Sequence, residues 1–519
     1  MTFKRYCGIL MHITSLPGRF GIGDLGPAAY HFVDFLKESG QSSWQFLPTG
    51  PVCRAFDYSP YMSLSAFAGN PLLISPEKLV EAGFLSAEEI ENCPDFSEYR
   101  VSFNDVVPFR EKIFRSAFDK FIAMGRSETF EQFCRKEPWL EDYALFMSLR
   151  EENNQKSWGQ WPRGIATRNK KSLTACRKRL SEEILYHKFV QYLFFEQWSQ
   201  LRQYCGEKGI KLIGDIPIYV GLDSADVWSH QDCFELDKKS LQPTHVAGVP
   251  PDYFSKTGQR WGNPLYRWHK GKGINRSLYE WWRQRFDKIG AMVDVVRIDH
   301  FRGFESFWEI PAGEKTAVKG VWKKGPGKFF FEQMADSIGD LSIIAEDLGI
   351  ITPEVEELRD SCGLPGMKIL QFAFDSGADN SYLPHNFTTP NCVIYSGTHD
   401  NDTTVGWYFD SEVSQAGKDR AVRYTNSKGD RIHWDFLRLA YGSVADLAVI
   451  PMQDVLGFGN DCRMNLPSSK NENWRWRCAS RFFTVDISHA LLDEVLFYNR
   501  HPGEEIQETV PEEDVALWK

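Results

Sequence analysis

The chain has 519 residues, of which 42% are hydrophobic, so it can bury a large core and is too long for a simple binding module. Its formal net charge is −10, and the charged residues are spread along the chain without acidic or basic runs. This distribution argues against nucleic acid or an anionic membrane as a partner and favours a neutral or small polar ligand.

The eleven cysteines are scattered along the chain and include no CxxC pair. An odd number of cysteines cannot pair completely within one chain, so we expect reduced thiols and a cytoplasmic location. The first residues carry charges and then run directly into a strand-like segment, without an apolar stretch of signal length. Secretion and membrane spanning are therefore not expected.

Short apolar or β-branched segments recur along the chain and are separated by helical stretches, which is typical of βα units around a parallel sheet. The predicted strands, eight in number, are residues 8–13, 43–47, 211–216, 292–298, 341–345, 367–372, 392–395 and 447–450. This is the number that a (β/α)8 TIM barrel requires. The predicted fold class is therefore α/β, with one catalytic barrel over residues 1–519.

Helices between these strands have recognisable ends. Pro27 suits the first turn of a helix that closes at Gly40, and Ser181 begins an amphipathic run that leads to the third strand. The spacing between the second and third strands is far longer than one βα unit. Residues 70–180 are therefore predicted to form an inserted, mainly helical subdomain, and residues 219–285 a second inserted segment after the third strand.

Three carboxylates stand at predicted strand ends, where barrels of this kind build their chemistry. Asp299 ends the fourth strand, Glu346 follows the fifth, and Asp400 comes shortly after the seventh. The alternative for any isolated carboxylate is a structural ion pair or a helix cap. Three of them at strand ends favour a catalytic site, whereas Asp347 and Asp402 are interpreted as turn or capping residues.

The surroundings of two of these carboxylates predict different roles. Strand alternation places Arg297 and Asp299 on one face, and a guanidinium there would lower the pKa of Asp299 and keep it ionised as a nucleophile. Glu346 follows three apolar residues, so desolvation is expected to raise its pKa and keep it protonated as a general acid. Such a pair, about 5 Å apart, defines a retaining glycosidase mechanism.

Two other functions, metal binding and nucleotide binding, are weakly supported by the sequence. His300 and His399 could be metal ligands, but no HxH or HExxH spacing supports a metal site, so we expect no metal and interpret both as hydrogen-bond donors to sugar hydroxyls. Residues 21–26 match the dinucleotide fingerprint GxGxxG. They do not follow a strand directly and lack the ribose-binding acid expected about 20 residues later, so no nucleotide cofactor is expected.

The sequence resembles the amylomaltases, also called disproportionating enzymes, a 4-α-glucanotransferase family of the α-amylase clan. The resemblance spans nearly the whole chain and includes the three strand-end motifs already described. The other matching motifs are Ser15-Leu16-Pro17-Gly18, Ser59-Pro60-Tyr61, Gly214-Asp215-Ile216-Pro217, Gly248-Val249-Pro250-Pro251-Asp252, Gly258-Gln259-Arg260-Trp261-Gly262 and Arg463-Met464-Asn465.

The resemblance implies that Asp299 is the nucleophile, Glu346 the acid/base and Asp400 a third carboxylate that binds sugar hydroxyls and stabilises the oxocarbenium-like state. It also implies substrate-binding residues. Those expected beside the cleaved bond are Ser59, Tyr61, Asp215, Arg297, His300, His399 and Asn465. Those expected in a loop over the glucan are Asp252, Gln259 and Trp261. No cofactor is implied.

The implied fold is the barrel with insertions and without a C-terminal β-sandwich. One segment departs from the family pattern, because residues 52–58 stand where family members have a shorter Gly-Tyr-Gly-Asp-type loop.

The implied substrates are maltooligosaccharides and α-1,4-glucan, with transfer to the 4-OH of an acceptor. A hydrolase shares the same covalent intermediate, so the carboxylates alone leave hydrolysis open. The loop from Gly248 to Trp261 combines prolines, aromatics and polar groups suited to excluding water, and this favours transfer. A catalytically inactive glucan-binding barrel is the third alternative.

Overall fold

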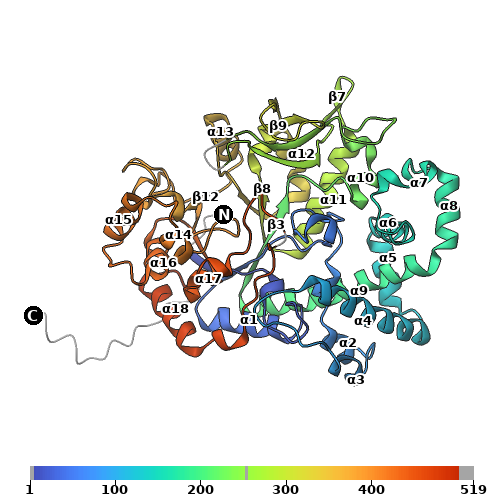
Figure 1. Cartoon of the computed structure of the whole chain (residues 1–519), viewed down its shortest axis with the longest axis horizontal. Helices are drawn as coiled ribbons and strands as arrows, with labels where there is room; N and C mark the ends of the chain where they lie inside the picture. The colour runs from blue at the N-terminus through green and yellow to red at the C-terminus, as the bar shows by residue number, and fades with distance from the viewer. Residues whose placement is uncertain (1–4, 252–254, 471, 502–519) are drawn as a thin grey trace, which may run out of the picture.

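The computed structural model describes residues 5–251, 255–470 and 472–501. Its centre is a parallel sheet with the strand order β11-β8-β3-β2-β1-β14-β13-β12 (Figure 1). The strands are β1 (Tyr6–Leu10), β2 (Ser43–Gln45), β3 (Lys211–Pro217), β8 (Val295–Asp299), β11 (Ser342–Ala345), β12 (Gly366–Ile369), β13 (Cys392–Tyr395) and β14 (Leu447–Pro451).

The two ends of this sheet meet at β11 and β12. The backbone N–H of Ala345 donates to the carbonyl oxygen of Pro365 at 2.9 Å, and the N–H of Met367 donates to Asp347 Oδ1 at 2.7 Å. The predicted TIM barrel is therefore confirmed, and each predicted strand overlaps one strand of the sheet.

Some strand boundaries differ from the prediction. The first strand ends at Leu10, and the 3-10 helix η1 (Ile13–Ser15) follows it, so His12 lies beyond the strand. The fourth begins at Val295, because Met292 is the last residue of helix α11 (Arg276–Met292). A buried apolar run does not distinguish a strand from an adjoining helix end, which explains both differences.

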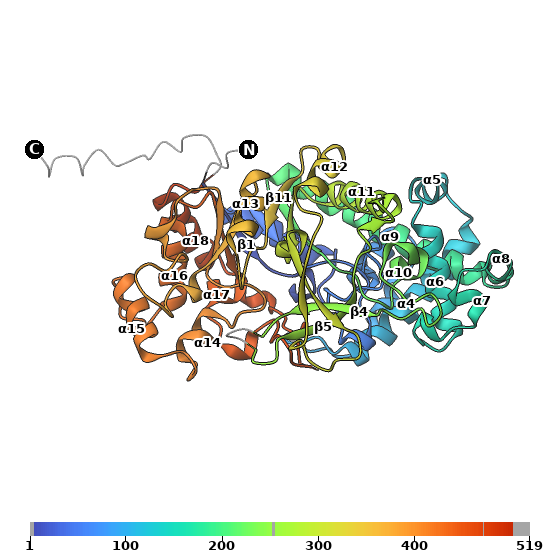
Figure 2. The same cartoon turned by 90° about the horizontal axis from the view of Figure 1, so that it is seen from above.

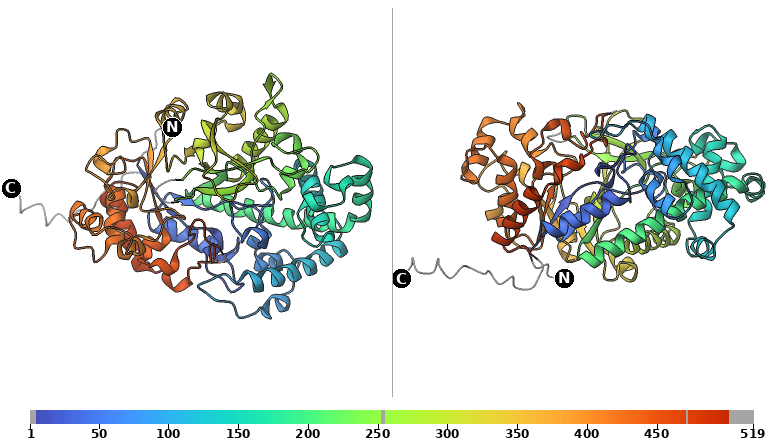
Figure 3. Two further views of the ribbon diagram at one scale, coloured as in Figure 1. Left: turned by 45° about the horizontal axis from the view of Figure 1, so that its top comes forward. Right: turned by 90° about the horizontal axis from the view of Figure 1, so that it is seen from below.

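Helices pack outside the barrel. α1 (Pro27–Glu38) begins at Pro27 as predicted, and α9 (Ser181–Lys208) ends at Gly209, whose φ of 74° stops the helix in the left-handed region. Figure 3 shows α1 and α9 beside each other, and the rings of Tyr30 and Tyr204 join them at 5.0 Å. The helices that follow β3 are α10 (Ala225–Ser229), α11, α12 (Lys328–Ile338), α13 (Pro353–Ser361), α14 (Thr404–Phe409), α15 (Gln415–Tyr424), α16 (Ile432–Gly442), α17 (Met452–Leu456) and α18 (Val485–Phe497).

The chain between β2 and β3 is mainly helical and extends to one side of the barrel (Figures 1 and 2). Its helices before α9 are α2 (Pro76–Glu81), α3 (Ala87–Glu91), α4 (Phe103–Met124), α5 (Glu128–Lys136), α6 (Leu140–Glu152), α7 (Arg163–Ala166) and α8 (Lys170–Arg179). Stacked rings such as Phe121 and Phe189, 4.4 Å apart, join this region to α9. The division into subdomains at the predicted residue numbers stays a prediction.

A second, antiparallel sheet, which the sequence analysis did not predict, has the strand order β10-β9-β4-β5. Its strands are β4 (His245–Val249), β5 (Gln259–Pro264), β9 (Ser306–Pro311) and β10 (Val321–Lys324), and the short pair β6 (His269–Lys270) and β7 (Gly273–Ile274) forms a separate hairpin. The sheet therefore joins the segment after β3 to the segment after β8, and it carries the predicted loop residues Gln259 and Trp261.

Within the described residues, no strand follows β14. The same part of the chain contains no helix long and apolar enough to cross a membrane.

Candidate active site

Asp299, Glu346 and Asp400 all lie beyond or at the carboxyl ends of barrel strands. Asp299 is the last residue of β8, and Glu346 follows the last residue of β11, the neighbour of β8 in the sheet. The register pairs Ala345 with Ile298, so the two carboxylates leave adjacent strands at the same level. Asp400 stands in the loop between β13 and α14.

The acid/base candidate is held by the backbone that carries the nucleophile candidate. The N–H of His300, the residue after Asp299, donates to Glu346 Oε2 at 2.6 Å, and the N–H of Leu348 donates to Glu346 Oε1 at 3.0 Å. His300 has a φ of 52°, in the left-handed region that few non-glycine residues adopt, and this turn directs its N–H toward Glu346. The two carboxylates are thus fixed relative to each other by one short backbone contact.

Glu346 is buried, and burial raises its pKa to about 8, although the Arg297 charge and the two backbone donors act in the opposite direction. The predicted upward shift of this pKa is confirmed. A carboxyl group with this pKa is mainly protonated at neutral pH and can donate a proton.

Arg297 lies between two carboxylates on the inner side of the barrel. Its Nη1 is 2.6 Å from Asp215 Oδ2 and 3.1 Å from Asp299 Oδ1, and the Tyr61 hydroxyl donates to Asp215 Oδ2 at 2.8 Å. Burial raises the pKa of Asp215 to about 7 against the effect of this guanidinium. The predicted placement of Arg297 and Asp299 on one face is therefore correct, and Asp215 and Tyr61 belong to the same network.

The prediction that Arg297 gives Asp299 a lowered pKa is wrong in its net direction. Burial raises the pKa of Asp299, and the nearby Asp400 charge adds to this increase, while Arg297 and His399 offset only part of it. The sequence placed the guanidinium correctly but gave no measure of the desolvation that opposes it.

Asp400 is the most exposed of the three carboxylates, and it is held by a neighbouring loop. Asn465 Nδ2 donates to Asp400 Oδ1 at 2.6 Å, and the backbone N–H of Asn465 donates to the His399 carbonyl at 3.1 Å. The imidazole of His399 stacks on the ring of Tyr61, with 5.0 Å between centroids and 12° between planes. Burial lowers the pKa of His399, so a neutral ring faces the carboxylates.

His300 and Trp261 connect the second sheet to the barrel end. The His300 ring lies 4.7 Å from the Trp261 ring in an edge-to-face arrangement, and burial lowers the pKa of His300 to about 3. Within the described residues, His300 Nε2 is buried without a hydrogen-bond partner. Gln259 Oε1 accepts a hydrogen bond from Trp261 Nε1 at 3.2 Å.

The remaining predicted residues are placed as follows. Ser59 is half-buried, and its Oγ accepts from the N–H of Tyr61 at 3.3 Å, so it shapes the turn that carries that ring. Asp252 lies outside the described residues. The carboxylates interpreted as structural keep that role, because Asp347 pairs with Arg359 and Asp402 accepts from the N–H of Thr403 at 2.7 Å.

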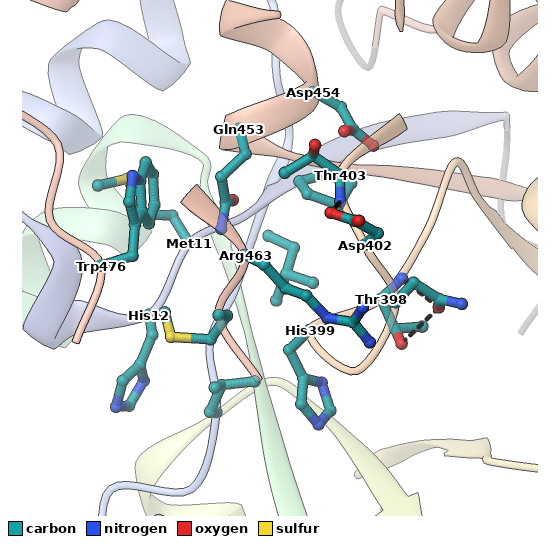
Figure 4. A pocket seen from close by; sticks show the side chains of 15 residues that line it. Met11, His12, Thr398, His399, Asp402, Thr403, Gln453, Asp454, Arg463 and Trp476 are labelled. Carbon is teal, nitrogen blue, oxygen red and sulfur yellow. Dashed lines mark hydrogen bonds between the residues drawn. The ribbon is translucent and has the colours of Figure 1, made fainter. Parts of the chain in front are cut away.

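A pocket beside His399 contains a residue that the sequence analysis missed. Figure 4 shows His12, His399 and Arg463 in its lining, with both imidazoles extending toward the same side. His12 is buried, its Nδ1 has no hydrogen-bond partner among the described residues, and burial lowers its pKa to about 3. Its signal, a polar residue after a barrel strand, was hidden because the first strand was predicted to continue past it.

Among the described residues, one group has the spacing of metal ligands: Glu151, Glu183 and His187 in the helical region. The Arg115 guanidinium lies 2.7 Å from Glu183 and 3.4 Å from Glu151, so a cation already balances these carboxylates. The loop of residues 21–26 has a comparable structural role, since Asp24 there pairs with buried Arg110 at 2.9 Å.

Comparisons with known proteins identify the relatives of this chain. A family model described as 4-alpha-glucanotransferase matches residues 11–482. The chain is 48% identical to a 4-alpha-glucanotransferase of Synechocystis, over 92% of this chain and 94% of that protein. It is 46% identical to one of Thermus thermophilus, over 92% and 95%. The solved amylomaltase from Streptococcus agalactiae in complex with acarbose superimposes with a TM-score of 0.91 and 39% identity, covering 96% of this chain and all of that one.

Proposed function

The chain belongs to the 4-alpha-glucanotransferase family, and we propose that it transfers α-1,4-glucan segments by a retaining double displacement at Asp299, Glu346 and Asp400. The donor is a maltooligosaccharide, and the acceptor is the 4-OH of another glucan or of glucose. The observation that carries the assignment of roles is the 2.6 Å hydrogen bond from the N–H of His300 to Glu346, because it fixes a buried carboxyl group beside the carboxylate at the end of β8.

In the first step, Glu346 donates its proton to the glycosidic oxygen while Asp299 attacks the anomeric carbon. The bond between the anomeric carbon and the leaving oxygen breaks, and its electron pair takes up the proton. The new carbon–oxygen bond joins the sugar to Asp299. The shortened glucan leaves with a free 4-OH.

In the second step, ionised Glu346 removes the proton from the 4-OH of an acceptor, which attacks the same carbon and releases Asp299. Two inversions at one carbon retain the α configuration. Asp400, oriented by Asn465, accepts hydrogen bonds from sugar hydroxyls as positive charge develops on the ring. Transfer prevails over hydrolysis when an acceptor sugar reaches the intermediate before water does.

The substrate-binding roles follow from which polar atoms stand near the carboxylates. His300 and His399, both neutral, suit hydroxyl groups as donors or acceptors, and Tyr61 offers an aromatic face beside Asp215. Ser59, Arg297, Gln259, Trp261 and Asp252 complete the proposed set. All eleven cysteines are free, which supports a reducing compartment such as the cytoplasm.

The product ladder from pure maltotriose tests this function. Transfer yields glucose and longer oligomers at a nearly constant number of reducing ends. A steady rise in reducing ends would replace the transferase with an α-amylase-like hydrolase. Maltotriose recovered unchanged, together with measurable binding, would indicate an inactive glucan-binding barrel.

A further inference from the structure

The loop of residues 397–403, which carries His399 and Asp400, must hold Asp400 in place although that side chain is largely exposed. Asp400 itself is held by Asn465 Nδ2, and His399 Nε2 is 3.4 Å from its Oδ1. The position of this carboxylate therefore depends on how the backbone of the loop is anchored. A displacement of about 1 Å at a reacting group is enough to reduce turnover substantially.

Both ends of this loop are bonded to one buried side chain, that of Asp454 on α17. Ser396 Oγ donates to Asp454 Oδ2 at 2.5 Å, at the end where the loop leaves β13. At the other end, the Thr404 N–H donates to Asp454 Oδ1 at 2.6 Å, and Thr404 Oγ1 donates to Oδ2 at 2.7 Å. One carboxylate thus joins the two residues that flank the loop.

Asp454 and the two side chains that bond to it are all buried. Asp454 is 2% exposed, and Ser396 and Thr404 are fully buried. A carboxylate out of water is costly unless donors satisfy its oxygens, and here the donors are those that flank the loop. Burial raises the pKa of Asp454, and its three hydrogen bonds act against that increase.

Other contacts hold the middle of the same loop. Arg463 Nη2 donates to the Asp400 carbonyl at 2.6 Å, and its Nε donates to the Asn465 carbonyl at 2.7 Å. Gln371 Nε2 donates to the Asp402 carbonyl at 2.8 Å. The bonds to the carbonyl oxygens of Asp400 and Asp402 fix single points of the loop, whereas Asp454 fixes the separation and orientation of its two ends. In Figure 4, Asp454 and His399 lie on opposite sides of the pocket.

We propose that Asp454 is a positioning residue for Asp400: it fastens both ends of the 397–403 loop to α17 and thereby sets where the third carboxylate meets the sugar. This inference rests on the proposed function, because it gives Asp400 its role in sugar binding. Asp454 acts through the loop and does not contact substrate.

The experiment compares the variants Asp454→Asn, Asp400→Asn and the double variant, in the full chain, by kcat and KM on maltotriose. In Asp454→Asn the amide oxygen can accept on one side only, while the NH2 group faces a donor on the other, so we expect kcat/KM to fall about 10- to 100-fold. The distinguishing readout is additivity. If Asp454 acts by placing Asp400, the double variant should be within about threefold of Asp400→Asn alone.

Two controls separate positioning from a general loss of stability. Asp226→Asn removes another buried carboxylate, which lies on α10, across the barrel from α14 (Figures 1 and 2). The Asp226 carboxylate accepts from the Ala66 N–H at 2.8 Å. This substitution should change thermal stability and leave kcat/KM within about twofold. If Asp454→Asn does not fold, the combined Ser396→Ala and Thr404→Val variant removes two of the three donors more gently and should give the same non-additive loss.

Each outcome has a definite meaning. Losses that multiply in the double variant, or wild-type kcat/KM in folded Asp454→Asn, overturn the inference. If the wild-type chain transfers glucan normally, such a result leaves the proposed function intact. If the wild-type chain gives no transfer products from maltotriose, the proposed function fails first.

Discussion

Replacing Glu346 with glutamine tests the proposed acid/base directly, because glutamine keeps the size of the side chain and removes its acidic proton. The carboxyl group accepts from two backbone N–H groups, of His300 and Leu348. The amide oxygen can accept one of these bonds, while the NH2 group faces the other donor. The variant should therefore fold, with a modest loss of stability of about 1–3 kcal/mol from one unsatisfied donor.

The expected loss of rate follows from the role of the proton. General acid–base catalysis contributes about 10²- to 10⁴-fold, which corresponds to roughly 2.7–5.4 kcal/mol of activation free energy. With maltotriose as donor, kcat/KM of Glu346→Gln should fall by this factor. With an α-maltosyl fluoride donor the leaving fluoride needs no proton from Glu346, so formation of the glycosyl-enzyme should remain within about tenfold of wild type.

The pH dependence of kcat/KM tests the acid role of Glu346 independently. Glu346 acts as an acid only while protonated, and burial raises its pKa to about 8, so wild-type kcat/KM should fall as the pH rises through about 8. The apparent pKa of this decrease in kcat/KM at high pH is a property of the interacting carboxylates of the site together. The decrease should disappear in Glu346→Gln with the fluoride donor, because the acid whose deprotonation causes it is replaced by a neutral amide.

The assay measures kcat/KM for glucose release from maltotriose and the first-turnover burst of fluoride release from the activated donor, which reports formation of the glycosyl-enzyme alone, from pH 5 to 10. Equal losses on both donors would contradict an acid role and point to a structural effect of the substitution. An unchanged rate on maltotriose would assign the proton to another residue.

Four further outcomes are expected. Asp299→Ala should abolish transfer and prevent a covalent glycosyl-enzyme from being trapped by mass spectrometry, while oligosaccharide binding by calorimetry persists; a trapped adduct in this variant would remove Asp299 as nucleophile. Tyr61→Phe deprives Asp215 of a 2.8 Å hydrogen bond and should lower kcat/KM about tenfold, and an unchanged value would separate this pair from catalysis. Arg500→Met removes a fully buried guanidinium that donates to several carbonyl oxygens, one of them Tyr6 O at 2.9 Å. The substitution should lower the free energy of unfolding, measured by urea titration, by roughly 3 kcal/mol. A loss below about 0.5 kcal/mol would refute this account. Dithiothreitol should leave the melting temperature unchanged because all eleven cysteines are free, and a decrease would reveal a disulfide.

The barrel could be predicted from the sequence because each of its strands is a short buried run, and the runs recur with helices between them. The same logic located Asp299 and Glu346, since a charged residue after such a run marks a strand end. Asp215 and Asn465 carry no comparable local signal. Asp215 lies inside a buried strand, and Asn465 lies in a loop far from any strand end, so the family resemblance supplied both.

What could not be predicted depends on contacts between distant segments. The second sheet pairs β4 with β9, about sixty residues apart along the chain, and neither segment has strong alternation of its own. Asp454 is invisible in the sequence for the same reason, because its partners Ser396 and Thr404 precede it by 58 and 50 residues. His12 was missed by an error of a few residues at one strand end.

The sign of the Asp299 shift shows how a correct contact can still give a wrong pKa. Arg297 Nη1 lies 3.1 Å from Asp299 Oδ1 and lowers the pKa of this carboxylate, yet desolvation at the barrel end is the larger effect, so the pKa is raised. Glu346 is more buried than Asp299, and its carboxyl group accepts from two backbone N–H groups, whereas Asp299 pairs with the Arg297 guanidinium. The proposed nucleophile and acid therefore differ in their partners: Asp299 pairs with a guanidinium, and Glu346 accepts from backbone N–H groups. A pKa of Asp299 below its ordinary value is not part of this difference.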